Sequence, residues 1–150
     1  MWGSEGGAGD LTVGGEAMLP GTDRASDRFV RASFYTGAVK KTADPVDAVA
    51  AAFSIIRNAS VPLGMQPPPG QPNIASTLWR TVADQKNRVY FFESTRSPNV
   101  FWVNLADVDF APGAPVKKLK LANGTEIYAG NVAAKFETAQ PFVFKAADAK

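Results

Sequence analysis

Three segments in the middle of the chain carry apolar residues on both of their alternating faces, and this pattern constrains the fold more than any other feature. The segments span 77–83, 88–93 and 99–105, and short polar stretches at 84–87 and 94–98 separate them. Their aromatic and β-branched residues predict antiparallel strands joined as hairpins. A sheet with one face in water would carry a polar residue at every second position, so this sheet needs cover on both faces.

Two helices are predicted before the sheet. The first runs from about Asp23 to Gly37, with Thr22 or Asp23 as its N-cap and Gly37 as its end. The second follows Asp44, which is a favourable N-cap with a proline directly after it, and it ends near Asn58. Apolar residues recur every three or four positions in the second helix, which indicates one buried face.

Two further patterns lie around these helices. Arg24, Arg28 and Arg31 fall in one row of the first helix, and we interpret this row as a solvated face. The segment 61–73 contains five prolines, which exclude a helix or a central strand and predict a stiff connector.

The last third of the chain predicts weaker strands. A strand at 116–121 is expected to pair with 127–129 across a turn at Asn123-Gly124, because Asn-Gly is the strongest short hairpin signal. Residues 142–144 are expected to form a last edge strand.

The predicted organisation is a Gly-rich N-terminal arm at 1–21, with seven of the thirteen glycines, and one α+β domain at 22–150. Two helices can cover one face of the antiparallel sheet, and no remaining segment is long enough to cover the other. We therefore expect half of a sandwich that a second sheet completes, from another polypeptide or from another copy of the chain. A homodimer or larger homo-oligomer, formed through the sheet face, is the predicted assembly.

Composition excludes several functions. The 150 residues suit one domain with a core, and they include no Cys and no His. Disulfides, thiolate or imidazole metal sites, a cysteine nucleophile and a Ser-His-Asp triad are therefore excluded within this chain. A net charge of +2 gives no case for nucleic acid or for an acidic membrane surface. The longest apolar run has six residues, which predicts no membrane span, and the first residues show no signal-peptide pattern.

Carboxylates are the remaining candidates for a metal site. Asp107 and Asp109 are predicted on one face of a strand, about 7 Å apart, and Asp84, Glu93 and Glu126 are candidates to join them. Carboxylates suit Mg²⁺, Ca²⁺ or Mn²⁺, and a bound ion would activate water for ester or phosphoester hydrolysis without His. The alternative is that these are turn carboxylates in solvent. The sequence indicates no other cofactor and no substrate-binding residue.

Two stretches of the sequence resemble the choloylglycine hydrolase and penicillin V acylase family of linear-amide hydrolases. The first is Met-Leu-Pro-Gly-Thr at 18–22, followed by Ser-Asp-Arg-Phe-Val-Arg-Ala-Ser-Phe at 26–34. The second, at 76–92, has a Thr- and Trp-bearing strand, a turn of Asp-x-Lys-Asn type and an aromatic strand. The resemblance covers roughly residues 15–145.

The resemblance implies a fold and a mechanism. Family members are four-layer αββα sandwiches whose nucleophile is a cysteine freed at the mature N-terminus, with its own α-amine as base. This chain resembles only the C-terminal part, so the nucleophile, its nearby aspartate and the oxyanion asparagine would lie outside it. Arg28 matches the family's active-site arginine, which helps to orient the nucleophile. Asp27 stands where the family often has Ser, and we expect this acid to pair with Arg28 and alter its electrostatic role.

Three hypotheses for function follow. The first is a truncated hydrolase that lacks the nucleophile and hence the family amidase activity when alone. The second is a free-standing oligomeric hydrolase that has re-used this part, takes a small-molecule substrate and uses a carboxylate-bound divalent metal. The third is a non-catalytic domain that binds a protein partner. The resemblance also implies a bacterial cytoplasmic or periplasmic location.

Overall fold

The computed structural model describes residues 19–70, 76–121 and 127–144. Most of the predicted N-terminal arm and the expected Asn123-Gly124 turn lie outside these residues. In chain order, the elements are α1 (Ala25–Ala38), α2 (Pro45–Asn58), β1 (Trp79–Asp84), β2 (Val89–Ser94), β3 (Val100–Asn104), the 3-10 helix η1 (Leu105–Asp107), β4 (Lys117–Lys118), β5 (Gly130–Asn131), the 3-10 helix η2 (Ala133–Lys135) and β6 (Glu137–Thr138). The protein is a mixed α/β structure with two helices and a sheet that is mostly antiparallel.

The main sheet has the strand order β1-β2-β3-β5. The two predicted hairpins are confirmed, since β1 pairs antiparallel with β2 and β2 with β3. β5 joins β3 in parallel. The register places Thr81 opposite Phe92 and Phe92 opposite Phe101, so these three residues share one face of the sheet.

The two helices begin differently. α2 follows the sequence prediction, because the Asp44 side chain accepts a hydrogen bond from the Asp47 backbone N–H at 2.9 Å. α1 begins at Ala25, after Arg24 and without a side-chain cap, so the expected cap at Thr22 or Asp23 is wrong. The Thr22 hydroxyl instead donates to the carboxylate of Asp27, which lies in the first turn of the helix.

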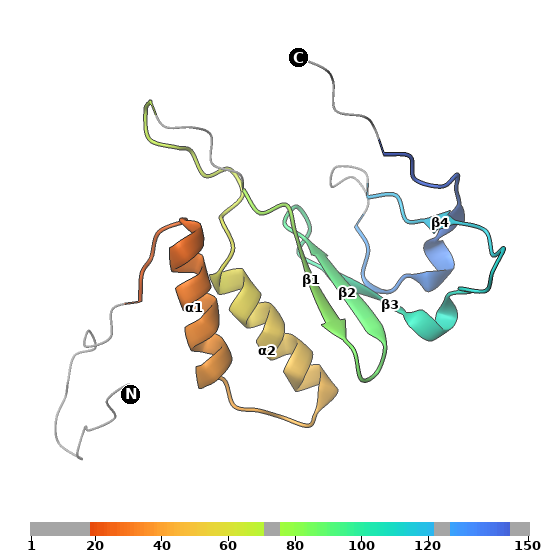
Figure 1. The fold of residues 1–150 in the computed structure, drawn as a ribbon, viewed down its shortest axis with the longest axis horizontal. Coiled ribbons are helices and arrows are strands. Elements are labelled where there is room, and N and C mark those ends of the chain that lie inside the picture. The colour runs from red at the N-terminus through yellow and green to blue at the C-terminus, as the bar shows by residue number, and fades with distance from the viewer. Residues whose placement is uncertain (1–18, 71–75, 122–126, 145–150) are drawn as a thin grey trace.

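α2 covers the first face of the sheet, and α1 lies beside α2 (Figure 1). Phe53 of α2 is 3% exposed, and its ring meets the Phe91 ring of β2 at a centroid distance of 6.5 Å. Phe91 in turn contacts Trp102 of β3. These aromatic residues account for one of the two apolar faces that the sequence pattern predicts.

The described residues cover only part of the second face. Phe101 and Val103 of β3 are buried together with Val132, and Phe136 packs against them. The Tyr128 ring meets the Phe101 ring edge-on at 5.6 Å. The expectation that nothing in this chain covers the second face is therefore wrong over β3. This cover could not be predicted from the sequence, because the C-terminal segment supplies it from short elements without a helix or long strand.

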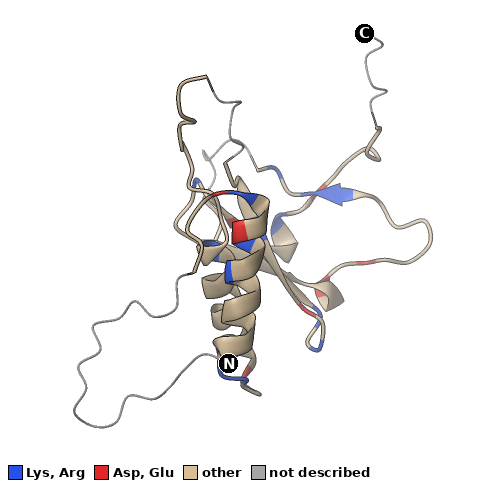
Figure 2. Ribbon diagram, turned by 60° about the vertical axis from the view of Figure 1, so that its left-hand side comes forward, with Lys and Arg blue, Asp and Glu red and all other residues tan. Residues whose placement is uncertain are grey.

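The C-terminal pairing also differs from the prediction. β4 pairs with β6, with Lys117 opposite Thr138, and not with residues 127–129. The neighbouring residues 130–131 are occupied by their pairing with β3. Residues 142–144 form no strand and are exposed. Figure 2 shows β4 as a short basic strand set apart from the helices.

Among the described residues, no helix combines the length and the apolar character that crossing a membrane requires.

Candidate functional site

Two arginines of α1 point at the C-terminal end of α2. Arg28 donates from Nε to the Ala59 carbonyl at 2.6 Å, and Arg31 donates from Nε to the Asn58 carbonyl at 3.1 Å. The last carbonyls of a helix lack helical partners and carry partial negative charge, so a guanidinium is well suited to them. The interpretation of this row as a solvated face is therefore wrong for Arg28 and Arg31.

Arg31 also binds the segment that precedes its own helix. Its Nη1 donates to the Pro20 carbonyl at 2.7 Å and to the Thr22 carbonyl at 2.9 Å. A single guanidinium thus holds three carbonyls from two segments far apart in the sequence. The planar fork of Arg presents several donors in fixed directions, which Lys cannot do.

Asp27 is held by hydroxyl groups. Its carboxylate accepts from the Thr22 hydroxyl and from the Ser26 hydroxyl. The hydrogen bond from Thr22 is the main reason that the pKa of Asp27 lies below its usual value. Within the described part of the chain, no ion pair joins Asp27 to Arg28. Consecutive side chains on a helix point about 100° apart, so adjacency in sequence does not bring them together.

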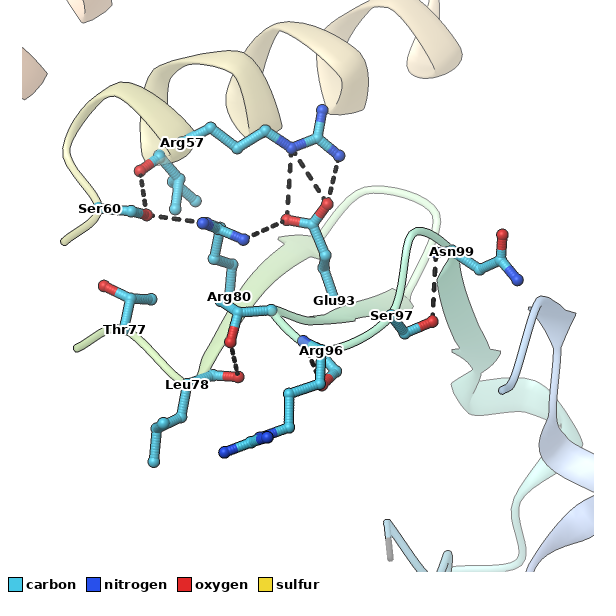
Figure 3. A network of polar contacts seen from close by, with 12 residues as sticks. Arg57, Ser60, Thr77, Leu78, Arg80, Glu93, Arg96, Ser97 and Asn99 are labelled. Carbon is cyan, nitrogen blue, oxygen red and sulfur yellow. Dashed lines mark hydrogen bonds and ion pairs between the residues drawn. The ribbon is translucent and has the colours of Figure 1, made fainter. Parts of the chain in front are cut away.

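A buried carboxylate lies between α2 and the β1–β2 hairpin (Figure 3). Glu93 of β2 is 6% exposed and forms ion pairs with Arg57 of α2 and with Arg80 of β1, the latter at 3.0 Å. Burial raises the pKa of Glu93, but hydrogen bonds and charges from the two arginines outweigh burial, so the pKa lies below its ordinary value.

The Glu93 network connects to the arginines of α1 through the end of α2. Arg80 donates from Nε to the Ser60 hydroxyl at 2.8 Å, and that hydroxyl donates to the Ile56 carbonyl. Ser60 directly follows Ala59, whose carbonyl binds Arg28. The chain of contacts therefore fixes Arg28 relative to β1 and β2.

From the sequence, Glu93 is a candidate metal ligand only. Its partner Arg57 lies 36 positions away, and no local pattern links the two. The contact between Arg80 and Glu93 could have been predicted from the sequence, because the hairpin register places the two residues directly opposite each other. Asp84, another candidate ligand, accepts from the Asn87 backbone and side chain in the hairpin turn, which lowers its pKa. Glu126 lies outside the described residues.

Asp107 and Asp109, predicted on one face of a strand, are not on a strand. β3 ends at Asn104, Asp107 closes η1, and Asp109 lies in the loop beyond. Asp107 accepts from the side-chain amide of Asn131 at 2.8 Å, and Asp109 accepts from the Ala111 backbone N–H at 2.9 Å. No group of three or more ligand side chains is found within residues 19–70, 76–121 and 127–144. The metal site stays a prediction, without a third ligand in these segments.

Comparisons with known proteins agree with one another. Residues 8–127 match the family described as linear amide C–N hydrolases, choloylglycine hydrolase family. The chain is 52% identical to a penicillin V acylase of Pectobacterium atrosepticum, over 88% of this chain and 39% of the relative. The solved structure of penicillin V acylase from Agrobacterium tumefaciens matches with a TM-score of 0.79 at 52% identity, over 90% of this chain and 43% of the other. The chain thus spans about two fifths of the length of these relatives.

Proposed function

The chain belongs to the choloylglycine hydrolase family of linear amide C–N hydrolases, and we propose that it is a C-terminal part of such an enzyme that lacks the family's amidase activity when alone. The absence of cysteine from all 150 residues carries this proposal, since the family mechanism depends on a cysteine nucleophile.

In this proposal, Arg28 is the part of the active site that the chain contributes. Its contact with the Ala59 carbonyl fixes the direction of the side chain. A guanidinium stays charged over the whole physiological pH range, so it offers a permanent positive charge to a nucleophile or to an anionic transition state. The amide substrate would bind only where a second polypeptide completes the site.

The experiment is an amidase assay of the purified full chain. Penicillin V and a bile-salt amide are the substrates, and full-length penicillin V acylase from Agrobacterium tumefaciens is the positive control. We expect product formation at the rate of the uncatalysed reaction. Turnover near that of the control enzyme would refute the proposal.

Two further arms address the other hypotheses. Ester and phosphoester substrates, with and without Mg²⁺ or Mn²⁺, test for a free-standing metal-dependent hydrolase. If any substrate is turned over, Arg28→Ala shows whether Arg28 takes part, because unchanged activity would exclude it. A non-catalytic partner-binding role is supported by the part of the second sheet face that stays open.

A further inference from the structure

The open part of the second sheet face carries an exposed aromatic side chain at one end and a cavity at the other. Trp79 begins β1 opposite Ser94, and Ala83 lies near the other end of the strand opposite Tyr90. Trp79 is 58% exposed at the first end. At a strand rise of about 3.3 Å per residue, Trp79 and Ala83 are roughly 13 Å apart along the sheet.

An apolar cavity lies at the other end of this face, where Ala83 pairs with Tyr90. Its volume is about 630 Å³, and its walls include Tyr90, Val103, Phe110, Val116 and Phe136. Phe110 and Val116 are large apolar side chains that remain exposed. An aromatic side chain that enters from outside would bury apolar surface here, and buried aromatic anchors dominate the energetics of interfaces.

Charges of opposite sign mark the two ends. Asp107 and Asp109 line the cavity. Arg96 is exposed just past the end of β2, at the Trp79 end of the sheet. Figure 3 shows the Arg96 side chain pointing away from α2, which covers the first face. The face therefore carries an aromatic side chain beside a cation at one end, and a cavity beside two carboxylates at the other.

We propose that this face binds a second copy of the chain in a two-fold dimer, with Trp79 of each copy in the cavity of the other. A two-fold axis that lies between the two faces, perpendicular to the line from Trp79 to the cavity, exchanges these two positions. It therefore brings both aromatic side chains to both cavities in one operation. The same operation brings Arg96 of each copy towards the Asp107 and Asp109 carboxylates of the other, so charge complementarity favours a second copy as the occupant.

Analytical ultracentrifugation of the full chain over a wide concentration range tests the dimer. We expect the mass of a dimer, and a dissociation constant that rises at least about a hundredfold in Trp79→Ser. Phe29→Ser is the matched control, since Phe29 is 73% exposed on α1, away from this face. A wild-type chain that stays monomeric at all concentrations overturns the proposal, and so does a dimer that Trp79→Ser leaves unchanged.

Charge reversal tests the geometry and does not depend on the tryptophan variant. Arg96→Asp and Asp109→Arg should each weaken the dimer by about tenfold. Mixing the two variants, or combining both changes in one chain, should restore affinity because positions 96 and 109 again carry opposite signs wherever they face each other. Failure of the mixture to associate better than its components overturns the proposed pairing. A chain that remains monomeric but binds the N-terminal part of a family hydrolase would overturn the proposal and assign the face to that partner.

Discussion

Glu93 shows how one charged side chain organises the junction between the helices and the sheet. It lies on the face that α2 covers, between Arg57 and Arg80, and both of its oxygens are engaged. Arg80 is itself only 15% exposed at its side chain, so it depends on Glu93 for a counter-charge.

We expect Glu93→Gln to lower the free energy of unfolding by about 2 kcal/mol at neutral pH. Folding lowers the pKa of Glu93 below its ordinary value of 4.5. The ionised carboxylate therefore stabilises the fold above pH 4.5, and this contribution is lost as the pH falls through the folded-state pKa. Urea unfolding measured from pH 7 to pH 3 should therefore show a shallower acid loss of stability in Glu93→Gln. The exposed Glu137→Gln is the control and should keep the wild-type slope.

Arg31 should matter more than an exposed arginine of the same helix. Loss of its bonds to the Pro20, Thr22 and Asn58 carbonyls in Arg31→Ala should cost about 1–2 kcal/mol in urea unfolding. Arg31→Lys should recover less than half, because a point charge cannot serve three carbonyls in different directions. Arg24→Ala, at an exposed position in the same row, should change stability by less than about 0.5 kcal/mol. Equal effects at the two positions would contradict this role of Arg31.

These residues also show where sequence reasoning stops. The family resemblance selects Arg28, but nothing in the sequence indicates that its partner is the Ala59 carbonyl. Adjacency suggested that Asp27 would pair with Arg28, whereas helix geometry separates the two side chains. Contacts between positions far apart in sequence depend on the tertiary fold, which local patterns do not encode.

At the scale of elements, prediction succeeds where a local signal is sufficient. The Asp44 cap and the two-residue periodicity locate α2 and the hairpins. Prediction fails for β4, because strand partners are chosen by tertiary packing and two residues carry no periodicity. The Gly130 φ of +74° marks the bend from which the chain enters the main sheet beside β3.

The β1–β2 hairpin offers a stabilising change. Arg88 has a φ of +56°, a left-handed conformation that side chains with a Cβ adopt at a cost. Arg88→Gly should relieve this cost and, after the greater entropy of the unfolded chain is deducted, raise the free energy of unfolding by about 0.5 kcal/mol. Lys86→Gly in the same turn has no such strain to relieve and should lower stability instead. Denaturant unfolding with the same sign for both variants would refute this explanation.

The described part of the molecule has a small core for the length of the chain. Among the described residues, five apolar side chains are buried and sixteen large ones are exposed. A 150-residue chain was expected to form a substantial core. The second sheet face and the outer side of α1 expose Trp79, Tyr90 and Phe29 instead of burying them in a core.

Stability should therefore depend on concentration. If folded chains associate, a hundredfold rise in protein concentration stabilises the folded dimer by about 2.7 kcal/mol, or half of that per chain. For a chain of this size, that corresponds to a rise in Tm of roughly 5 °C. Differential scanning calorimetry at about 1 and 100 μM should show this rise in the wild type and in Phe29→Ser, but not in Trp79→Ser. A Tm that is the same at both concentrations in the wild type would show that the small core is sufficient for the isolated chain, because no association would then contribute to its stability.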